Sequence, residues 1–362
     1  MSKLTISCSR NENAALECLV CLARAAAGCG VALGLLGCAV AAGSPRAAGD
    51  LSSGPRAVRV AGAERDPGSS ESERPAGKAS AAGLSIAAAR RYMLELINRD
   101  RASAGLEAVV LDEGPAQRAG QAHAEDMARR GYLGHWGSDG SVPEQRFTEA
   151  GGTDMVLENA SCFTDEKNRT LDRAPAIDPK SVELAERMFF NERPPHDGHR
   201  RNILKPWHKR VGIGVAQPIA TETEIAAPCF AQEFVDAYGT YGALPRSARV
   251  GDVVHVDGAV QSPATFAGVG MARIDVPRPL GVGELNRRRS YPVPAPYVMY
   301  WPPGFQTPIP VRTTANRFMV DVPVSDEGKP GLYEVSIWAS VPGSNDLVMV
   351  SLRTILTAAP AR

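Results

Sequence analysis

The spacing of apolar residues changes once along the chain, near Tyr241, and this change limits the folds that the chain can adopt. Before this point, apolar residues recur at helical spacing in several segments, with short apolar runs between them. After it, short β-rich runs follow one another, separated by Pro, Gly and Asn. A chain of 362 residues is long enough for about two domains. We therefore predict an α/β or α+β domain over residues 84–240 and an all-β, sandwich-like domain over residues 241–362.

Helix caps and helix breakers place the elements of the first domain. Ser85 and Asp178 each precede apolar residues at helical spacing, and Pro179 suits the first helical position. Asp112 is predicted to cap another helix, which ends near Gly131. A short helix and two strands complete this domain, at residues 143–150, 211–216 and 229–236.

The second domain contains five runs rich in β-branched and aromatic residues, at 250–256, 297–301, 318–324, 332–339 and 347–357. Its single histidine, His255, lies in one of these runs and is predicted to be structural. No cluster of candidate catalytic residues is found there.

The N-terminal residues resemble an export signal. An apolar run over residues 25–37 follows Arg24 and is too short to span a bilayer. It ends in Leu-Leu-Gly-Cys at Cys38, which resembles a bacterial lipobox, so we predict a signal peptide over residues 1–38 and lipidation of Cys38. An ordinary signal peptide and a buried helix are the alternatives. Because the polar segment before Arg24 is long, a start codon assigned too far upstream is a further hypothesis.

Residues 39–83 are rich in Ala, Gly, Ser and Pro and have no hydrophobic period. Such a segment buries too little apolar surface to offset its chain entropy, so we predict a disordered linker. A flexible coil of this length spans about 35 Å on average, and it would tether the folded domains to a membrane.

Five of the seven cysteines lie within the predicted signal peptide, and only Cys162 and Cys229 follow it. An exported protein reaches an oxidising compartment, where two remaining thiols tend to pair. We therefore predict a disulfide between Cys162 and Cys229.

The charge balance gives no reason to expect a nucleic-acid partner. Lys plus Arg and Asp plus Glu both number 40, which gives a net charge of zero. The exported part also lacks a P-loop, a Gly-x-Ser-x-Gly motif and a Cys-x-x-Cys pair.

Residues 188–214 carry the densest group of potentially reactive side chains. Glu192, His196 and His199 lie around a turn rich in Pro and Gly, between an apolar helical segment and a short helical run. His208 follows, and because basic residues flank it we predict that it is exposed.

Six blocks of the sequence are similar to the CAP superfamily, which includes cysteine-rich secretory proteins, plant pathogenesis-related proteins and bacterial extracytoplasmic relatives. They occur in the order typical of that family, at residues 96–106, 122–127, 131–135, 158–160, 198–204 and 211–214. Gly-His-Arg-Arg at residues 198–201 replaces the Gly-His-Phe-Thr-Gln of the eukaryotic family, as in bacterial members. The resemblance implies that residues 84–238 form an α-β-α sandwich with a surface cleft.

The resemblance also implies a set of cleft residues: His135, Glu158, Glu192 and His199. Two imidazoles and two carboxylates suit zinc or a similar divalent cation, and with an open position such a site can activate water. Without a metal, a histidine beside a carboxylate can act as a general base, so the same four residues are the catalytic candidates. His196 is a local rival of His199. A purely structural alternative is that these residues form a hydrogen-bonded network that fixes the cleft walls.

We therefore predict an exported cell-envelope lipoprotein, held at the membrane by a lipid anchor, whose CAP domain is a binding module rather than an enzyme of defined chemistry. Its cleft is expected to hold a divalent cation and a lipid or another small ligand. One alternative is a metal-assisted or His/Glu hydrolase that acts on peptides or envelope polymers. Another is a structural or adhesion module in which the β-sandwich is the working part. His123, on a predicted helix face, is assigned to packing.

Overall fold

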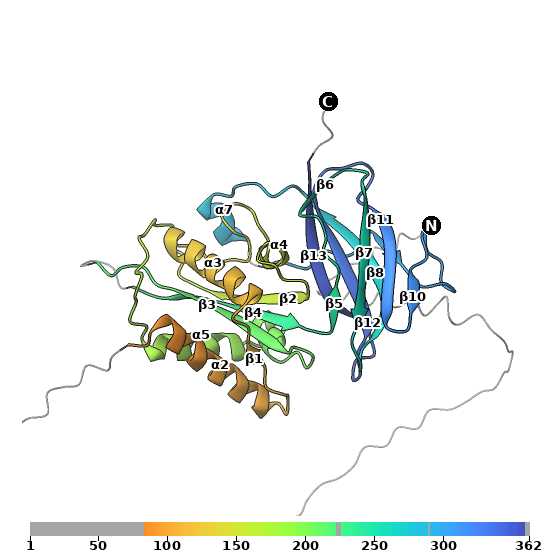
Figure 1. Ribbon diagram of the computed structural model, residues 1–362. Helices are drawn as coiled ribbons and strands as arrows, with labels where there is room; N and C mark the ends of the chain where they lie inside the picture. Colours follow the sequence, from red (N-terminus) through yellow and green to blue (C-terminus); the bar gives the residue numbers. More distant parts are fainter. Residues whose placement is uncertain (1–82, 222–225, 289, 359–362) are drawn as a thin grey trace, which may run out of the picture. The chain divides into compact units, whose positions relative to one another are not determined.

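The computed structural model describes residues 83–221, 226–288 and 290–358. The predicted signal peptide, with Cys38, and residues 39–82 of the predicted linker lie outside these ranges. The fold combines helices and sheets, as the sequence predicts, with an α-β-α part followed by a β-rich part (Figure 1). None of the helices in the described ranges has the length and the apolar character that crossing a bilayer requires.

The N-terminal domain has one sheet between two layers of helices (Figure 1). The strand order is β1-β3-β4-β2, with β1 parallel to β3 and the other neighbours antiparallel. Helices α2 and α5 cover one face of the sheet, and α3 and α4 cover the other. The strands are β1 (Val110–Leu111), β2 (Met155–Ser161), β3 (Arg210–Ala216) and β4 (Cys229–Asp236). The helices are α2 (Ile86–Ser103), α3 (Pro115–Arg130), α4 (Pro143–Glu149), α5 (Pro179–Phe190) and α6 (Gly198–Ile203).

The predicted caps decide where α2 and α5 begin. The Ser85 side chain accepts a hydrogen bond from the backbone N–H of Ala88, and the Asp178 side chain accepts one from Lys180. The prediction for Asp112 was wrong, because Gly114 is the cap of α3 and the Asp112 carboxylate accepts from the backbone N–H of Gly114 instead. A side chain two residues before the cap forms this local turn without reaching into the helix.

Helix α3 lies directly on β3 because two glycines of that strand leave room for its backbone. A Cβ atom added at Gly212 would lie 2.2 Å from the carbonyl carbon of Ala116, and one at Gly214 would lie 2.0 Å from the carbonyl oxygen of Gly120. Both distances are shorter than any van der Waals contact. The Val-Gly-Ile-Gly run therefore fixes how closely helix and sheet approach.

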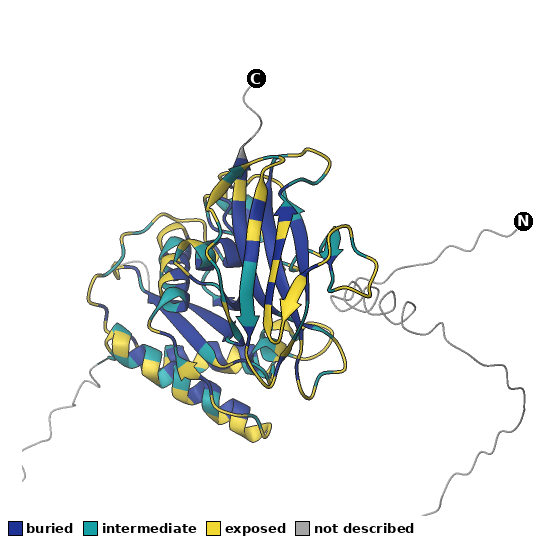
Figure 2. Cartoon of the chain, turned by 45° about the vertical axis from the view of Figure 1, so that its right-hand side comes forward, coloured by how far each residue is buried: buried dark blue, intermediate teal, exposed yellow. Residues whose placement is uncertain are grey.

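The β domain is a sandwich of two sheets with strand orders β10-β11-β7-β5 and β6-β13-β12-β8-β9. Apolar side chains from both inner faces form its core, for example Val256, Phe318 and Ile337. Strand β11 alternates exposed and buried residues, as Figure 2 shows. The elements are β5 (Gly239–Tyr241), β6 (Ser247–Arg249), β7 (Val253–Val260), β8 (Thr265–Ile274), α7 (Val282–Arg287), β9 (Val298–Tyr300), β10 (Arg312–Thr314), β11 (Arg317–Pro323), β12 (Leu332–Ser340) and β13 (Val348–Ala358).

Strand β13 joins the β domain to the N-terminal domain. The Ser351 hydroxyl donates to the carbonyl oxygen of Thr153 at 2.5 Å, and the backbone N–H of Thr354 donates to the Thr148 hydroxyl at 3.3 Å. The described residues on both sides of Tyr241 belong to a single compact unit. The β domain therefore packs against α4 and the edge of the N-terminal sheet formed by β2.

The predicted disulfide between Cys162 and Cys229 is confirmed. Cys229 begins β4 and Cys162 directly follows β2, its neighbour in the sheet, and their Cα atoms lie 4.4 Å apart. The bond therefore ties two adjacent strands together at one end of the sheet.

Candidate functional site

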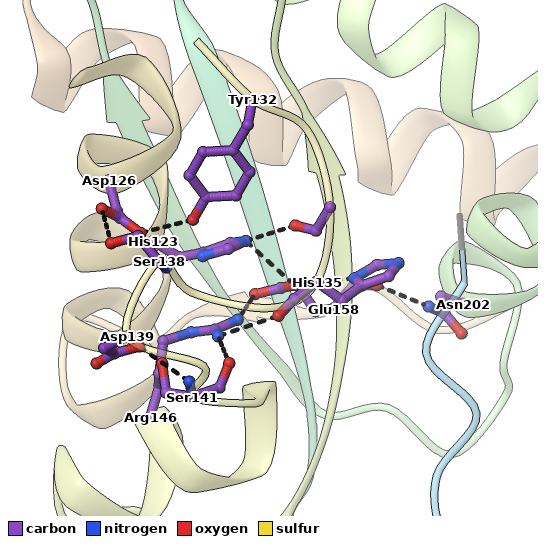
Figure 3. Close-up of polar contacts among 11 residues, drawn as sticks. His123, Asp126, Tyr132, His135, Ser138, Asp139, Ser141, Arg146, Glu158 and Asn202 are labelled. Carbon is purple, nitrogen blue, oxygen red and sulfur yellow. Dashed lines mark hydrogen bonds and ion pairs between the residues drawn. The ribbon is translucent and has the colours of Figure 1, made fainter. Parts of the chain in front are cut away.

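His135 lies on the loop between α3 and α4, and its ring is held by a carboxylate. Its Nδ1 lies 2.9 Å from Oε1 of Glu158, and the guanidinium of Arg146 donates to Oε2 of the same carboxylate at 2.6 Å (Figure 3). The Glu158 side chain is 1% exposed, whereas 17% of the His135 side chain reaches solvent. Arg146 also donates to the backbone carbonyl of His135, at 3.0 Å. The carboxylate and the guanidinium together fix the ring and its backbone.

The surroundings of Glu158 keep it ionised. Burial would raise the pKa of this carboxyl, but His123, when protonated, and Arg146 hold it well below its usual range. Because burial lowers the pKa of His123 to about 4, Arg146 is the cation that acts at neutral pH. Glu233, directly opposite Glu158 on β4, responds the other way: burial and the charge of Glu158 raise its pKa well above the usual value. The facing carboxyls therefore share a single negative charge.

His199 repeats the arrangement of His135 on the other side of the site. It lies in the first turn of α6, and its Nδ1 is 2.6 Å from Oε1 of Glu192, which follows the end of α5. The second oxygen of Glu192 accepts from the backbone N–H of His199 at 2.9 Å. Burial lowers the pKa of His199, which favours the neutral form of the ring. The ring also packs on Phe189, with 4.8 Å between the ring centroids.

The two histidines face one another across the site, with ring centroids 6.3 Å apart. Two asparagine side chains join β2, which carries Glu158, to the segment that carries His199. Asn159 on β2 donates to the backbone carbonyl of His199 at 3.2 Å, and Asn202 donates to the side-chain oxygen of Asn159 at 2.9 Å. These bonds explain why an Asn in the Glu-Asn-Ala block and an Asn in the Asn-Ile-Leu block belong to the same site.

Comparison with protein families gives a match over residues 94–221, to the cysteine-rich secretory protein family, the CAP family. This part of the chain is a CAP domain. The match includes His135, Glu158, Glu192 and His199, and the β domain lies beyond it. Searches of the curated proteins and of the solved structures gave no match.

The other histidines of the CAP domain lie apart from this pair or behind it. His196 is exposed, and its backbone N–H donates to the carbonyl of Arg193. The prediction that His208 is exposed was wrong: it is 1% exposed, and its Nδ1 is hydrogen-bonded to the buried Asp236. Flanking lysines predict exposure poorly because long basic side chains reach solvent from positions next to a buried residue. His123 is buried, and its Nε2 lies 2.7 Å from the carbonyl oxygen of Gly134, which agrees with a packing role.

Sequence reasoning missed Arg146 and Glu233, which set the charge of Glu158. Arg146 lies on the short helix α4, where a charged residue normally indicates a solvated face. A signal for Glu233 does exist, because it lies within Cys229–Asp236, a predicted strand most of whose residues are apolar. A carboxyl in such a position must be neutral or paired.

The geometry narrows the residues that could hold a metal ion. Both oxygens of Glu158 and both of Glu192 already accept hydrogen bonds, and the Nδ1 atom of each histidine takes part in one of these bonds. Within residues 83–221, 226–288 and 290–358, no group of three or more His, Cys, Asp or Glu side chains is arranged to hold an ion. Among these residues, none forms a hydrogen bond to Nε2 of His135 or of His199. Of the four ring nitrogens of this histidine pair, these two therefore remain available to a ligand.

Proposed function

We propose that the CAP domain is a binding module that holds a divalent cation, such as zinc, through Nε2 of His135 and Nε2 of His199. The observation that carries this proposal is the matched placement of two carboxylates behind the two rings. Glu158 and Glu192 each engage the Nδ1 of one histidine, so each ring is held as the tautomer that has its lone pair on Nε2. The carboxylates thus orient the ligands and do not serve as ligands themselves.

The separation of the rings tests whether they fit one ion. A zinc-bound imidazole places its ring centre about 3.2 Å from the metal, because the Zn–N bond is about 2.0–2.1 Å. Two such rings at a tetrahedral angle would have centres about 5.2 Å apart, from the same bond length. The observed 6.3 Å exceeds this by about 1 Å, so the rings must approach slightly when an ion binds.

The charges around the site favour a cation at neutral pH. Zinc binds neutral imidazole, and burial lowers the pKa of His199, so little proton release is needed. Glu158 stays ionised beside Arg146 and supplies a negative charge behind His135. A zinc ion held by two imidazoles keeps further positions open for water or for a small ligand in the cleft.

Calorimetric titration with zinc tests this function. The mature protein and three variants are compared: His135→Ala, His199→Ala and, as a matched control, His196→Ala. We expect each site variant to weaken binding by tenfold or more, while the control binds as the wild type does. Equal and negligible heats for all four proteins would rule out the metal site. Binding that survives both site substitutions would place the ion elsewhere.

We also propose that the protein is exported and anchored to the cell envelope through a lipid on Cys38. The disulfide between Cys162 and Cys229 supports export, because such bonds persist in oxidising compartments and are rare in the cytosol. Residues 39–83 would then serve as the tether between the anchor and the CAP domain.

A further inference from the structure

The connection between β8 and β9 is far longer than these neighbouring antiparallel strands require. It takes up residues 275–297, whereas hairpin loops usually have two to five residues. Part of this connection, residues 278–288, leaves the β domain and packs on the CAP domain. This part contains the short helix α7, which lies beside α3 (Figure 1). We call residues 278–288 the strap.

The strap packs on the loop that carries His135, residues 131–141. Leu285 of the strap is 1% exposed and belongs to the same apolar cluster as Tyr132. The backbone N–H of Leu280 donates to the carbonyl oxygen of Ser138 at 2.9 Å. The side-chain oxygen of Asn286 accepts from the backbone N–H of Leu133 at 3.1 Å. The hydrogen bonds therefore hold the loop on both sides of His135.

Trp136, the residue after His135, is held between two side chains that come from the same connection. The guanidinium of Arg288 lies 4.8 Å from the centre of the indole ring, a cation–π contact. The ring of Tyr291 meets the indole edge to face at 5.0 Å, and its hydroxyl donates to Glu144 of α4. Neither Arg288 nor Tyr291 belongs to the segment that matches the CAP family.

Gly140 shows how closely the strap approaches the loop. Its φ is +87°, and a Cβ atom at this position would lie 2.2 Å from the carbonyl oxygen of Arg278. Any other residue would be strained in its backbone and would displace the strap.

The inner side of the same loop is held by α3. The carboxylate of Asp126 accepts from the backbone N–H of Ser138 at 2.7 Å and from its hydroxyl at 2.8 Å, and it also accepts from the Tyr132 hydroxyl at 2.6 Å (Figure 3). The loop therefore has α3 on one side and the strap on the other, and the position of His135 depends on both.

We infer that the strap positions His135, so that the β domain completes the candidate metal site of the CAP domain. Asn286 is its main positioning residue, because its side-chain oxygen accepts from the backbone N–H of Leu133, two residues before His135. This inference rests on the proposed function for its consequence in metal affinity, but the placement of the His135 ring can be measured without metal.

The test compares three variants of the mature protein by NMR of ¹⁵N-labelled histidine and by zinc calorimetry. Asn286→Ala removes both the acceptor for the Leu133 N–H and the 3.5 Å bond that the Asn286 amide donates to Glu166. Asn286→Asp loses the bond to Glu166 but keeps an acceptor oxygen for Leu133. Arg287→Ala, an exposed change on the same helix, is the control. We expect Asn286→Ala to speed exchange of the His135 Nδ1 proton tenfold or more and to weaken zinc binding about tenfold. Asn286→Asp should keep both the proton exchange rate and the zinc affinity close to those of the wild type, and Arg287→Ala should change neither.

The outcomes separate the two proposals. If the wild type binds no zinc but Asn286→Ala still speeds proton exchange, the metal function fails and the positioning role stands. If Asn286→Ala leaves both exchange and affinity unchanged, or if Arg287→Ala has the same effects as Asn286→Ala, the positioning role is refuted. Circular dichroism of each variant confirms that it is folded before the comparison is made.

Discussion

Glu186 offers the sharpest test of the electrostatics inside the CAP domain. It lies on the buried face of α5 with no exposed surface, and one of its oxygens accepts from the amide of Gln232 at 2.6 Å. No hydrogen bond from the described residues reaches its other oxygen. Burial is the main reason that its pKa rises to about 8, and the nearby Asp100 raises it further. The folded protein therefore holds a proton here that the unfolded chain loses near pH 4.5.

The magnitude follows from this difference in pKa. Above pH 4.5 folding takes up one proton at Glu186, so the free energy of unfolding falls by about 1.4 kcal/mol per pH unit until the pH reaches about 8. The contribution of Glu186 to stability is thus largest at low pH and is lost as the pH rises through this window. Glu186→Gln has nearly the same shape, keeps an oxygen for the Gln232 amide and carries no titrating group. The variant should gain about 3 kcal/mol relative to wild type between pH 5 and pH 7.

Guanidinium unfolding, followed by tryptophan fluorescence at pH 5, 6, 7 and 8, measures this difference. Glu183→Gln, a partly exposed position on the same helix, controls for the change in net charge. Because Gln keeps an acceptor oxygen for the Tyr92 hydroxyl, the variant should alter the free energy of unfolding by about 0.5 kcal/mol or less at each pH. Because all other titrating groups are shared, they cancel in the comparison. Wild-type and Glu186→Gln curves that stay parallel from pH 5 to pH 8 would refute the reasoning.

Two further predictions concern the covalent features of the chain. Replacing Cys162 and Cys229 with Ser should lower the free energy of unfolding by about 4 kcal/mol, because the bond closes a loop with a sequence separation of 67; thermal unfolding checks this, and a loss below 1 kcal/mol would contradict it. Cys38→Ser should move the protein from the membrane fraction to the soluble fraction of the cells that produce it, and unchanged fractionation would count against the lipid anchor.

The helices of the CAP domain were predictable because local chemistry sets their ends. Ser85 and Asp178 act as caps through their own side chains, and Gly131 ends α3 with a φ of +66°, which glycine adopts freely. The site was predictable only as a set of residues. The resemblance to the family identified His135 and His199, but their facing arrangement depends on contacts between segments that are distant in the sequence.

Strand β8 and the strap were not predicted from the sequence, each for its own reason. Gly268 and Gly270 interrupt β8 with residues that normally indicate a loop, yet these glycines make room for the side chains of Trp301 and Met299 beside the strand. The strap has an irregular backbone around one short helix, and its apolar residues Leu280 and Leu285 are buried only because another domain covers them. Periodicity within a segment carries no information about such a partner.

Arg146 was not predicted as a site residue, yet it sets the charge of Glu158, which was. Glu158 and Glu233 face each other on neighbouring strands, and two buried like charges in that position repel. Arg146 bonds Glu158, so Glu158 keeps the charge and Glu233 keeps the proton. An ionised Glu158 can only accept a hydrogen bond, and it therefore holds the proton of the His135 ring on Nδ1. The guanidinium of Arg146, without touching the imidazole, thereby favours the His135 tautomer that has its lone pair on Nε2.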